Sequence, residues 1–318
     1  METDDAGASQ RRPGLIAYLD QFVYVKLARA GLEKGTPEDA ALRQRLLAAV
    51  AADQLSCPLS SVHYLETWRQ ADALRRRRLA AEMMRFSRLL TMSPARHLWC
   101  QEIGHALRLI FSKPPQVAAV QPWGRGVAHA FAVEKQAQDD VDSSGEVWRE
   151  FSILAGVGES RFEEQERERH EAAERFSRHQ SAAAARLAVW KTDTTDRRSR
   201  FRVQALSDFQ ADIIPVLIGA DVTPEEFAAI GAEGLERLVE AIPTIWTLTE
   251  LRRVRFQNPA QGFSTHDLND LRALCSAIVY CDVVVADKAW CDAIGRTDLG
   301  RRFETVVLND VSLVEQIL

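Results

Sequence analysis

The residues best suited to chemistry in this 318-residue chain are acids that follow short apolar runs. Asp20 ends the run Leu15–Leu19, and Asp287 closely follows the β-branched run Val283–Val285. An ionised carboxylate beside buried strand residues needs a cation or hydrogen-bond donors, so several such acids together indicate a divalent metal site. Each Asp by itself could equally be the N-cap of the helix that follows it. The prediction of a metal site therefore depends on the presence of both acids at the ends of strands.

The segments around these acids alternate between strand and helix at both ends of the chain. Short apolar runs predict strands at 15–19, 56–60, 283–286 and 305–308, separated by segments with helical apolar spacing. Strands that alternate with helices imply a parallel α/β sheet flanked by helices. This arrangement puts the two acids at the carboxyl ends of buried strands, where open parallel sheets bind ligands.

The middle of the chain differs from both ends. Residues 71–261 contain no convincing alternating segment and predict a large, mainly α-helical insertion. Residues 13–70 and 262–318 would then form one discontinuous α/β domain. Within the insertion, residues 159–179 interleave Glu with Arg, which predicts an exposed helix with pairs of opposite charge one turn apart.

Composition limits the class of protein further. The chain is 46% apolar, with a formal net charge of −5, which is typical of a globular protein with a sizeable core. It has no apolar run long enough to cross a membrane and no secretory signal at its start, so we expect a cytoplasmic protein without membrane contact. Its five cysteines contain no Cys-x-x-Cys pair, which excludes a zinc ribbon and predicts reduced thiols.

A dense run of arginines follows residue 70, with only Asp72 and Glu82 as nearby acids. Its six candidate nucleic-acid-binding residues are Arg75, Arg76, Arg77, Arg78, Arg85 and Arg88. If they line a groove beside the acids, they would bind a phosphate backbone with a steep dependence on salt concentration. The alternatives are a solvated helix face and a docking surface for an acidic protein partner.

Three blocks of the sequence resemble the PIN domain family of metal-dependent nucleases. They are LIAYLD with Asp20, SSVHYLETW with Glu66, and NDLRALCSAIVYCDVVVADKAW with Asp270, Asp282 and Asp287. The resemblance covers 15–70 and 262–318 and implies a PIN-like sheet with a catalytic metal site. It implies that Asp20, Glu66, Asp270 and Asp287 are catalytic metal ligands. Asp282 either assists them, by binding a second ion or orienting another ligand, or caps the turn before the strand.

Two positions qualify this assignment. Asp267 competes with Asp270 as the third ligand, because residues three apart on one helix lie on nearly the same face. Spacing to Asp287 favours Asp270, and Asp267 is then a helix cap or a residue that orients a ligand. Val285 stands where the family often has Thr or Ser, so one polar contact to metal-bound water is missing.

The resemblance also implies an activity, which is endonucleolytic RNA cleavage with Mg²⁺ or Mn²⁺ that leaves a 3′-hydroxyl and a 5′-phosphate. The insertion suggests a role in substrate selection, homo-oligomerisation or control by a regulatory protein, as in a toxin-like defence or stress effector. Three alternatives stay open: a structure-specific or single-strand DNA nuclease, a non-catalytic RNA- or protein-binding scaffold, and a phosphohydrolase for small nucleotides. His63 and His266 either contact substrate or are satisfied helix-end histidines.

Overall fold

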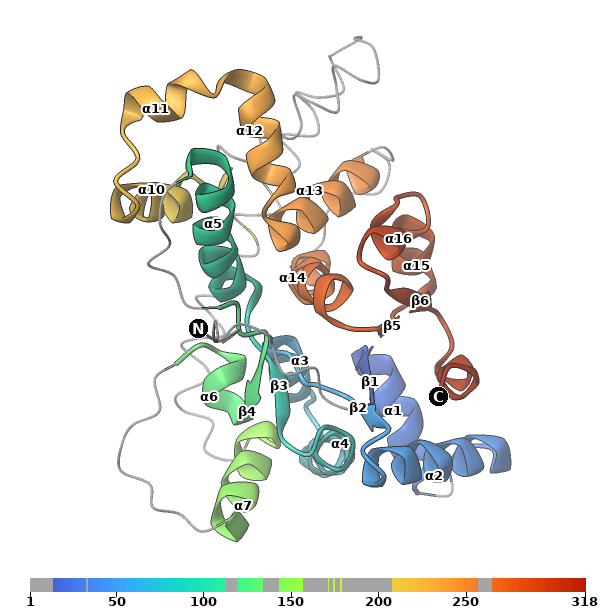
Figure 1. Ribbon diagram of the computed structural model, residues 1–318. Coiled ribbons are helices and arrows are strands. Elements are labelled where there is room, and N and C mark those ends of the chain that lie inside the picture. The colour runs from blue at the N-terminus through green and yellow to red at the C-terminus, as the bar shows by residue number, and fades with distance from the viewer. Residues whose placement is uncertain are drawn as a thin grey trace, which may run out of the picture. The chain divides into compact units, whose positions relative to one another are not determined.

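A computed structural model describes residues 14–32, 34–112, 119–133, 143–156, 208–256 and 265–318, together with the single residues 171, 174 and 178. The chain divides into two compact units, and each combines segments that are far apart in sequence (Figure 1). The sheet unit comprises Arg11–Pro94, Pro122–Ala173 and Tyr280–Leu318. The helical unit comprises Met1–Gln10, Ala95–Gln121 and Glu174–Val279.

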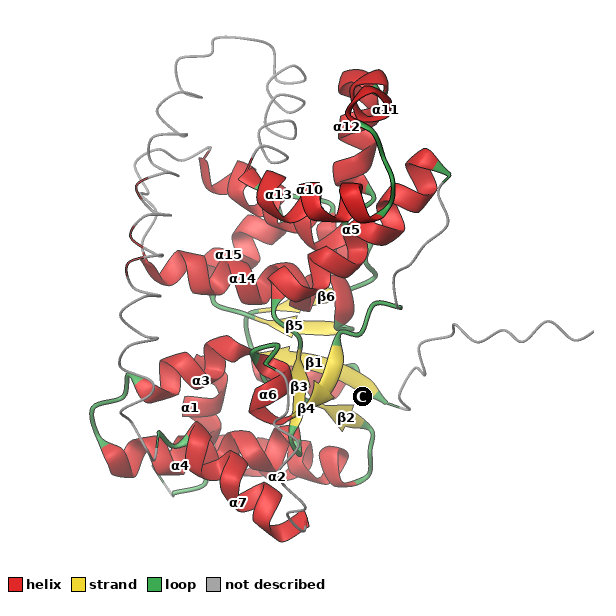
Figure 2. Cartoon of the chain, turned by 90° about the vertical axis from the view of Figure 1, so that its left-hand side faces the viewer, coloured by secondary structure: helices red, strands yellow, loops and turns green. Residues whose placement is uncertain are grey.

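A four-stranded parallel sheet with the order β2-β1-β5-β6 lies in the sheet unit (Figure 2). Its strands are β1 (Leu15–Leu19), β2 (Leu55–Ser56), β5 (Val283–Val285) and β6 (Val306–Leu308). The two central strands, β1 and β5, are apolar throughout and almost entirely buried, as expected of parallel strands covered on both faces. A parallel α/β sheet built from both chain ends, as predicted, is therefore confirmed.

Helices surround this sheet and follow its strands in sequence. Four of them group around β1 and β2 in Figure 1: α1 (Gln21–Ala30), α2 (Pro37–Ala51), α3 (Ser61–Trp68) and α4 (Ala73–Ser87). The chain after β5 forms α15 (Lys288–Ile294), α16 (Leu299–Arg302) and the 3₁₀ helix η1 (Val311–Gln316). Local signals start several of these helices. Thr36, for example, begins α2 with a capping box and a proline in the first turn.

The sheet unit extends further into the middle of the chain than the sequence predicted. Antiparallel strands β3 (Leu90–Met92) and β4 (Trp123–Arg125), with α6 (Gly126–Ala130) and α7 (Ser143–Leu154), belong to it. The expected insertion boundary near residue 71 therefore differs from the observed division of the chain. Strands of three residues are too short to show alternation, and β3 is held by a parallel bridge from Thr91 to Leu59.

The helical unit contains α5 (Ala95–Phe111), α10 (Gln210–Gly219), α11 (Pro224–Ala229), α12 (Gly231–Glu240), α13 (Pro243–Phe256) and α14, whose range Thr265–Tyr280 ends at the unit boundary. The prediction had assigned α14 to the sheet domain instead. The charged helix predicted at 159–179 lies almost entirely outside the described residues. No helix among the described residues is both long enough and apolar enough to span a membrane.

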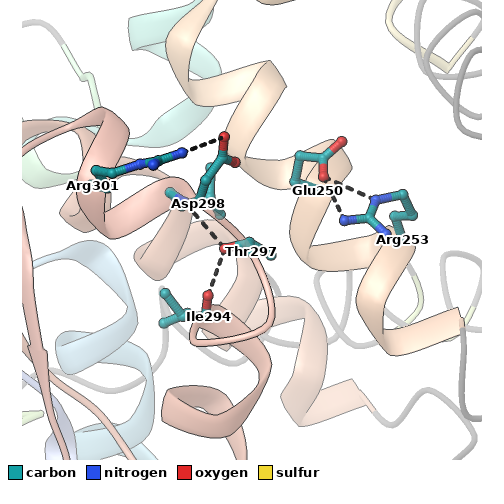
Figure 3. A network of polar contacts seen from close by, with 7 residues as sticks. Glu250, Arg253, Ile294, Thr297, Asp298 and Arg301 are labelled. Atoms are coloured by element: carbon teal, nitrogen blue, oxygen red, sulfur yellow. Dashed lines mark hydrogen bonds and ion pairs between the residues drawn. The ribbon is translucent and has the colours of Figure 1, made fainter.

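Short polar contacts hold the ends and turns of several helices in each unit. The Oε2 atom of Glu102 accepts hydrogen bonds from the backbone N–H and the hydroxyl of Thr244, at 2.9 and 2.6 Å. Figure 3 shows the Oε2 atom of Glu250 accepting two bonds from Arg253, at 2.9 and 2.7 Å. The same view shows Thr297 of the sheet unit donating to the Ile294 carbonyl at 2.6 Å, which closes the end of α15.

Candidate active site

Asp20 and Asp287 lie at the same edge of the sheet. Strands β1 and β5 are adjacent and parallel, with Leu19 opposite Val285, and the Asp20 N–H donates to the Val285 carbonyl at 3.0 Å. Asp20 follows β1 directly, and Asp287 follows β5 after one intervening residue. We call this the carboxyl edge. Ligands of open parallel sheets bind at such an edge, so the two acids occupy the position that the sequence predicted.

Each of these acids also caps a helix. Asp20 Oδ1 accepts from the Gln21 N–H at 2.6 Å at the start of α1, and Asp287 Oδ1 accepts from the Trp290 N–H at 2.9 Å at the start of α15. Both bonds use a single carboxylate oxygen and fix the direction in which the group points. Helix N-termini carry partial positive charge, so acidic side chains suit both cap positions.

Glu66 lies on α3, which is hydrogen-bonded to the end of β1. The Nε2 atom of His63 lies 2.8 Å from the Leu19 carbonyl, and the side chain of Gln21 donates to the Thr67 hydroxyl at 3.2 Å. These contacts join α3 to the residues on either side of Asp20. Glu66 is half-buried and lies between His63 and Thr67 in the helix.

His63 is a structural residue of this edge and does not contact solvent. Its Nδ1 atom accepts from the Ser60 N–H at 2.9 Å, so the proton resides on Nε2 and is donated to Leu19. The side chain is only 1% exposed, and burial lowers its pKa to about 4. The sequence left two interpretations of His63 open. The structure supports the second, a histidine at a helix end whose hydrogen bonds are satisfied within the protein.

The electrostatic influence of both acids reaches Cys291 on α15. Burial raises the pKa of this thiol, and the negative charges of Asp287, Asp292 and Asp20 raise it further. Its Sγ atom lies 3.4 Å from the Ala286 carbonyl. Cys291 is therefore a thiol and not a thiolate at neutral pH, which argues against a nucleophilic role.

A metal at this edge would be bound mainly by oxygen ligands. In the part of the chain that the structure describes, no group of three or more His, Cys, Asp or Glu side chains could hold a metal ion. Mg²⁺ commonly uses one or two carboxylates and completes its shell with waters and substrate phosphates. Asp20, Asp287 and Glu66 offer the hard oxygen ligands that Mg²⁺ and Mn²⁺ prefer. The type of ligand therefore fits these ions, although no closed protein cage is present in the described residues.

Comparison of the chain with protein families, curated proteins and solved structures found no match. The resemblance to PIN domains therefore depends on the sequence blocks alone.

Asp282 does not belong to the carboxyl edge. Its Oδ2 atom accepts from the Ile16 N–H at 2.8 Å, and its own N–H donates to the Ile16 carbonyl at 2.9 Å. Asp282 precedes β5, whereas Asp287 follows it, so the two acids lie at opposite ends of the strand. The structure thus corrects the expectation that Asp282 assists the same metal site, because this carboxylate ties the start of β5 to β1.

Asp267 and Asp270 differ in their surroundings within the helical unit. Asp267 is buried and accepts from Arg255 at 2.6 Å, so its charge is already compensated. Asp270 is half-buried one turn further along α14. The membership of Asp270 in the catalytic set stays a prediction.

The arginines of α4 serve several purposes inside the sheet unit. Arg76 donates to the Gln70 carbonyl at 2.7 Å, Arg85 pairs with Glu82 at 3.0 Å, and Arg88 pairs with Asp53 at 2.6 Å. Much of the arginine density in the sequence therefore reflects intramolecular contacts.

The remaining three arginines of the predicted set are exposed. Arg75 lies 3.4 Å from Asp72, and the charges of Arg75 and Arg78 help to lower the pKa of Asp72, whose backbone hydrogen bonds are the main cause. Arg77 has no hydrogen-bond or ion-pair partner among the described residues. The basic surface available to a ligand on α4 is consequently smaller than the sequence implied.

Two contributors to the carboxyl edge were not predicted from the sequence. Gln21 follows Asp20 and contacts Thr67 on α3, but a glutamine in the first turn of a helix carries no signal for such a contact. Cys291 sits four residues after Asp287, and its spacing to the acid is the only hint of proximity that the sequence offers.

Proposed function

We propose that this protein is a metal-dependent phosphodiesterase, and specifically an endoribonuclease of the PIN type, whose acids include Asp20, Glu66 and Asp287. One observation carries the proposal. Asp20 and Asp287 follow adjacent parallel strands at a common edge, and α3, which carries Glu66, is hydrogen-bonded to that edge. Asp270 stays a candidate from its position in the sequence block alone.

The proposed chemistry assigns each residue a limited task. A bound Mg²⁺ or Mn²⁺ would activate water and neutralise charge that develops on the phosphate. Asp20 and Asp287 would supply carboxylate oxygens whose direction is fixed by their N-cap bonds. Glu66 would supply a further oxygen or orient the attacking water.

Other catalytic strategies find little support among the neighbouring side chains. His63 is buried with both ring nitrogens engaged, so it is not available as a general base. The raised pKa of Cys291 keeps its thiol protonated. Neither side chain therefore competes with the carboxylates of this edge as the reactive group.

The test compares Asp20→Asn and Asp287→Asn with the wild type and with Asp292→Asn. Asparagine is about as good an N-cap as aspartate, so the first two changes remove a charge while keeping the helix start. Asp292 is an exposed acid on the same helix as Cys291 and is the matched control. Cleavage of single-stranded RNA and DNA is measured with Mn²⁺, with Mg²⁺ and with EDTA.

We expect metal-dependent RNA cleavage that falls more than about 100-fold in both cap variants, beyond the usual cost of losing a residue that only orients a ligand. Asp292→Asn should cleave like the wild type. Full activity in Asp20→Asn and Asp287→Asn would refute the proposed site. Cleavage of DNA in preference to RNA would change the proposed substrate to DNA and leave the proposed active site unchanged.

A non-catalytic scaffold is the second candidate, and one observation favours it. The N-cap bonds of Asp20 and Asp287 account for both acids without any metal. The scaffold hypothesis predicts that the wild type neither cleaves RNA nor binds Mn²⁺ in calorimetry. The nuclease hypothesis predicts that the wild type binds Mn²⁺ and that Asp20→Asn weakens this binding.

A further inference from the structure

A pocket of about 150 Å³ lies in the sheet unit, beside the amino-terminal ends of β2 and β3. Its walls come from the turns that follow α2 and α4 and from Arg125 of β4. It is therefore distinct from the carboxyl edge, which lies at the opposite ends of the strands. Its polar lining consists of Asp53, Ser56, Ser87, Arg88 and Arg125.

Several hydrogen-bond donors at this pocket have no partner among the described residues. The Nη1 atom of Arg88 donates to Asp53 Oδ1 at 2.6 Å and to the Val50 carbonyl at 3.2 Å. A guanidinium has five N–H groups in a planar fork, so the Nε and Nη2 donors of Arg88 are not used by these bonds. Arg125 lies 3.9 Å from the nearest oxygen of Glu146, which is longer than a hydrogen bond.

The backbone at the pocket adopts conformations that large side chains rarely adopt. Asp53, Arg88 and Leu89 have φ values of 55°, 49° and 67°, and two of them are consecutive. Strained backbone of this kind persists where the surrounding structure enforces it, often at sites that clamp a ligand. The strained residues belong to the two turns that place Asp53 and Arg88 at the pocket. Arg88 connects these two turns through its bonds to Asp53 and Val50.

The charge balance decides which ligand the pocket favours. The carboxylate of Asp53 and the C-terminal ends of α2 and α4 oppose an anion, because helix C-termini carry partial negative charge. Arg88 offsets both through its bonds to Asp53 and to the Val50 carbonyl. Arg125 adds a second positive charge, which the half-exposed Glu146 carboxylate, 3.9 Å away and not hydrogen-bonded to it, offsets only in part, and Ser56 adds a hydroxyl.

The geometry points to a binding site for a phosphate group, held between the guanidinium groups of Arg88 and Arg125. The planar forks of two arginines match the oxygens of a phosphate, either free or as a monoester. The pocket is larger than a single water requires, so a small oxyanion fits. Asp53 competes with the ligand for Arg88 and so limits its affinity.

The test is calorimetric titration of the full chain in EDTA with inorganic phosphate and, separately, with a nucleoside 5′-monophosphate. The variants are Arg125→Gln, Asp53→Asn and the control Arg108→Gln, an exposed arginine of α5. Arg125 is preferred to Arg88 because Arg88 also holds the two turns together. Metal and cleavage play no part in this measurement, so its result is independent of the proposed nuclease activity.

We expect Arg125→Gln to weaken phosphate binding about tenfold, as for the loss of hydrogen bonds to a charged group. Asp53→Asn should tighten it roughly twofold to fivefold, because one competing exposed charge is removed. Arg108→Gln should bind like the wild type. The proposal is overturned by a wild type that binds neither probe, or by equal weakening in Arg125→Gln and Arg108→Gln. Tighter binding of the monophosphate would identify the monoester as the preferred form.

Discussion

Burial of His63 couples the stability of the carboxyl edge to pH. The pKa of this histidine is lowered from 6.5 to about 4 by burial, while its two hydrogen bonds join Ser60 to Leu19. Below pH 6.5 the unfolded chain binds a proton at this residue and the folded chain does not. Protonation therefore favours unfolding, and the stabilisation that is present above pH 6.5 is lost as the pH falls toward 4.

We predict that the free energy of unfolding decreases by about 2 kcal/mol between pH 7.5 and pH 5 because of His63. Urea denaturation at several pH values measures this decrease. In His63→Gln that part of the pH dependence should disappear, although the variant is less stable at every pH. The exposed His97 provides the control, because His97→Gln should keep the wild-type pH profile. An unchanged profile in His63→Gln would contradict the prediction.

Individual residues differ in how far their sequence context reveals their position. Asp20 and Asp287 could be placed at the carboxyl edge because each follows an apolar run. Residue type alone could not show that Asp282 lies outside the carboxyl edge. This follows only from the observed start of β5 at Val283, which places Asp282 at the opposite end of the strand. The buried state of His63 also depended on tertiary contacts, namely Tyr18 and Tyr24, whose rings lie 5.2 and 5.4 Å from its own.

Among the helices, α4 is anchored by an ion pair that the sequence did not reveal. Arg43 of α2 donates to Glu82 of α4 at 2.5 and 2.9 Å, and the two residues are 9% and 1% exposed. Glu82 also pairs with Arg85. Glu82 is thus shared between Arg43 of α2 and Arg85 of α4, a contact between two helices that residue counts along a single helix could not show.

We predict that Glu82→Leu destabilises the protein by about 3 to 5 kcal/mol, because it leaves the Arg43 guanidinium buried without a partner. The double change Arg43→Met with Glu82→Leu should recover most of this loss, since the remaining side chains are apolar. Chemical denaturation measures both. Arg45→Met, which breaks the exposed pair with Glu315, should have little effect and is the control. A double variant as unstable as the single one would refute this account.

Composition, and not strand length, explains which strands could be predicted. The strands β1 and β5 are apolar and buried, and their positions were predicted to within one residue. The strands β3 and β4 were missed although they are as long as β5, because neither has a run of β-branched residues like Val283–Val285. Their pairing depends on contacts between distant segments, which a single sequence does not encode locally.

At the level of the whole molecule, the chain crosses between its two units five times. The sheet unit is completed only by its final segment, which supplies β5 and β6. Without it, β1 would have β2 as its only neighbour and would expose an apolar edge.

We predict that a chain ending at Val279 is insoluble or aggregates, because the unpaired edge of β1 can associate with other chains. The soluble fraction and size-exclusion profile of this truncation, compared with those of the full chain, test the prediction. A peptide of residues 280–318 supplied during refolding should increase the soluble yield. A monomeric, folded protein ending at Val279 would contradict the expected dependence of the sheet on its last two strands.

The pairing of β1 with β5 also constrains how the protein forms during synthesis. Ile16 and Asp282 bond to each other across 266 positions of the chain. At typical elongation rates, β1 waits roughly 10 to 50 seconds on the ribosome before its partner strand has been made. Contacts of such long range fold slowly, and the early strands remain exposed meanwhile. Production of this protein should therefore depend on chaperones that bind nascent chains, more strongly than its modest size would suggest.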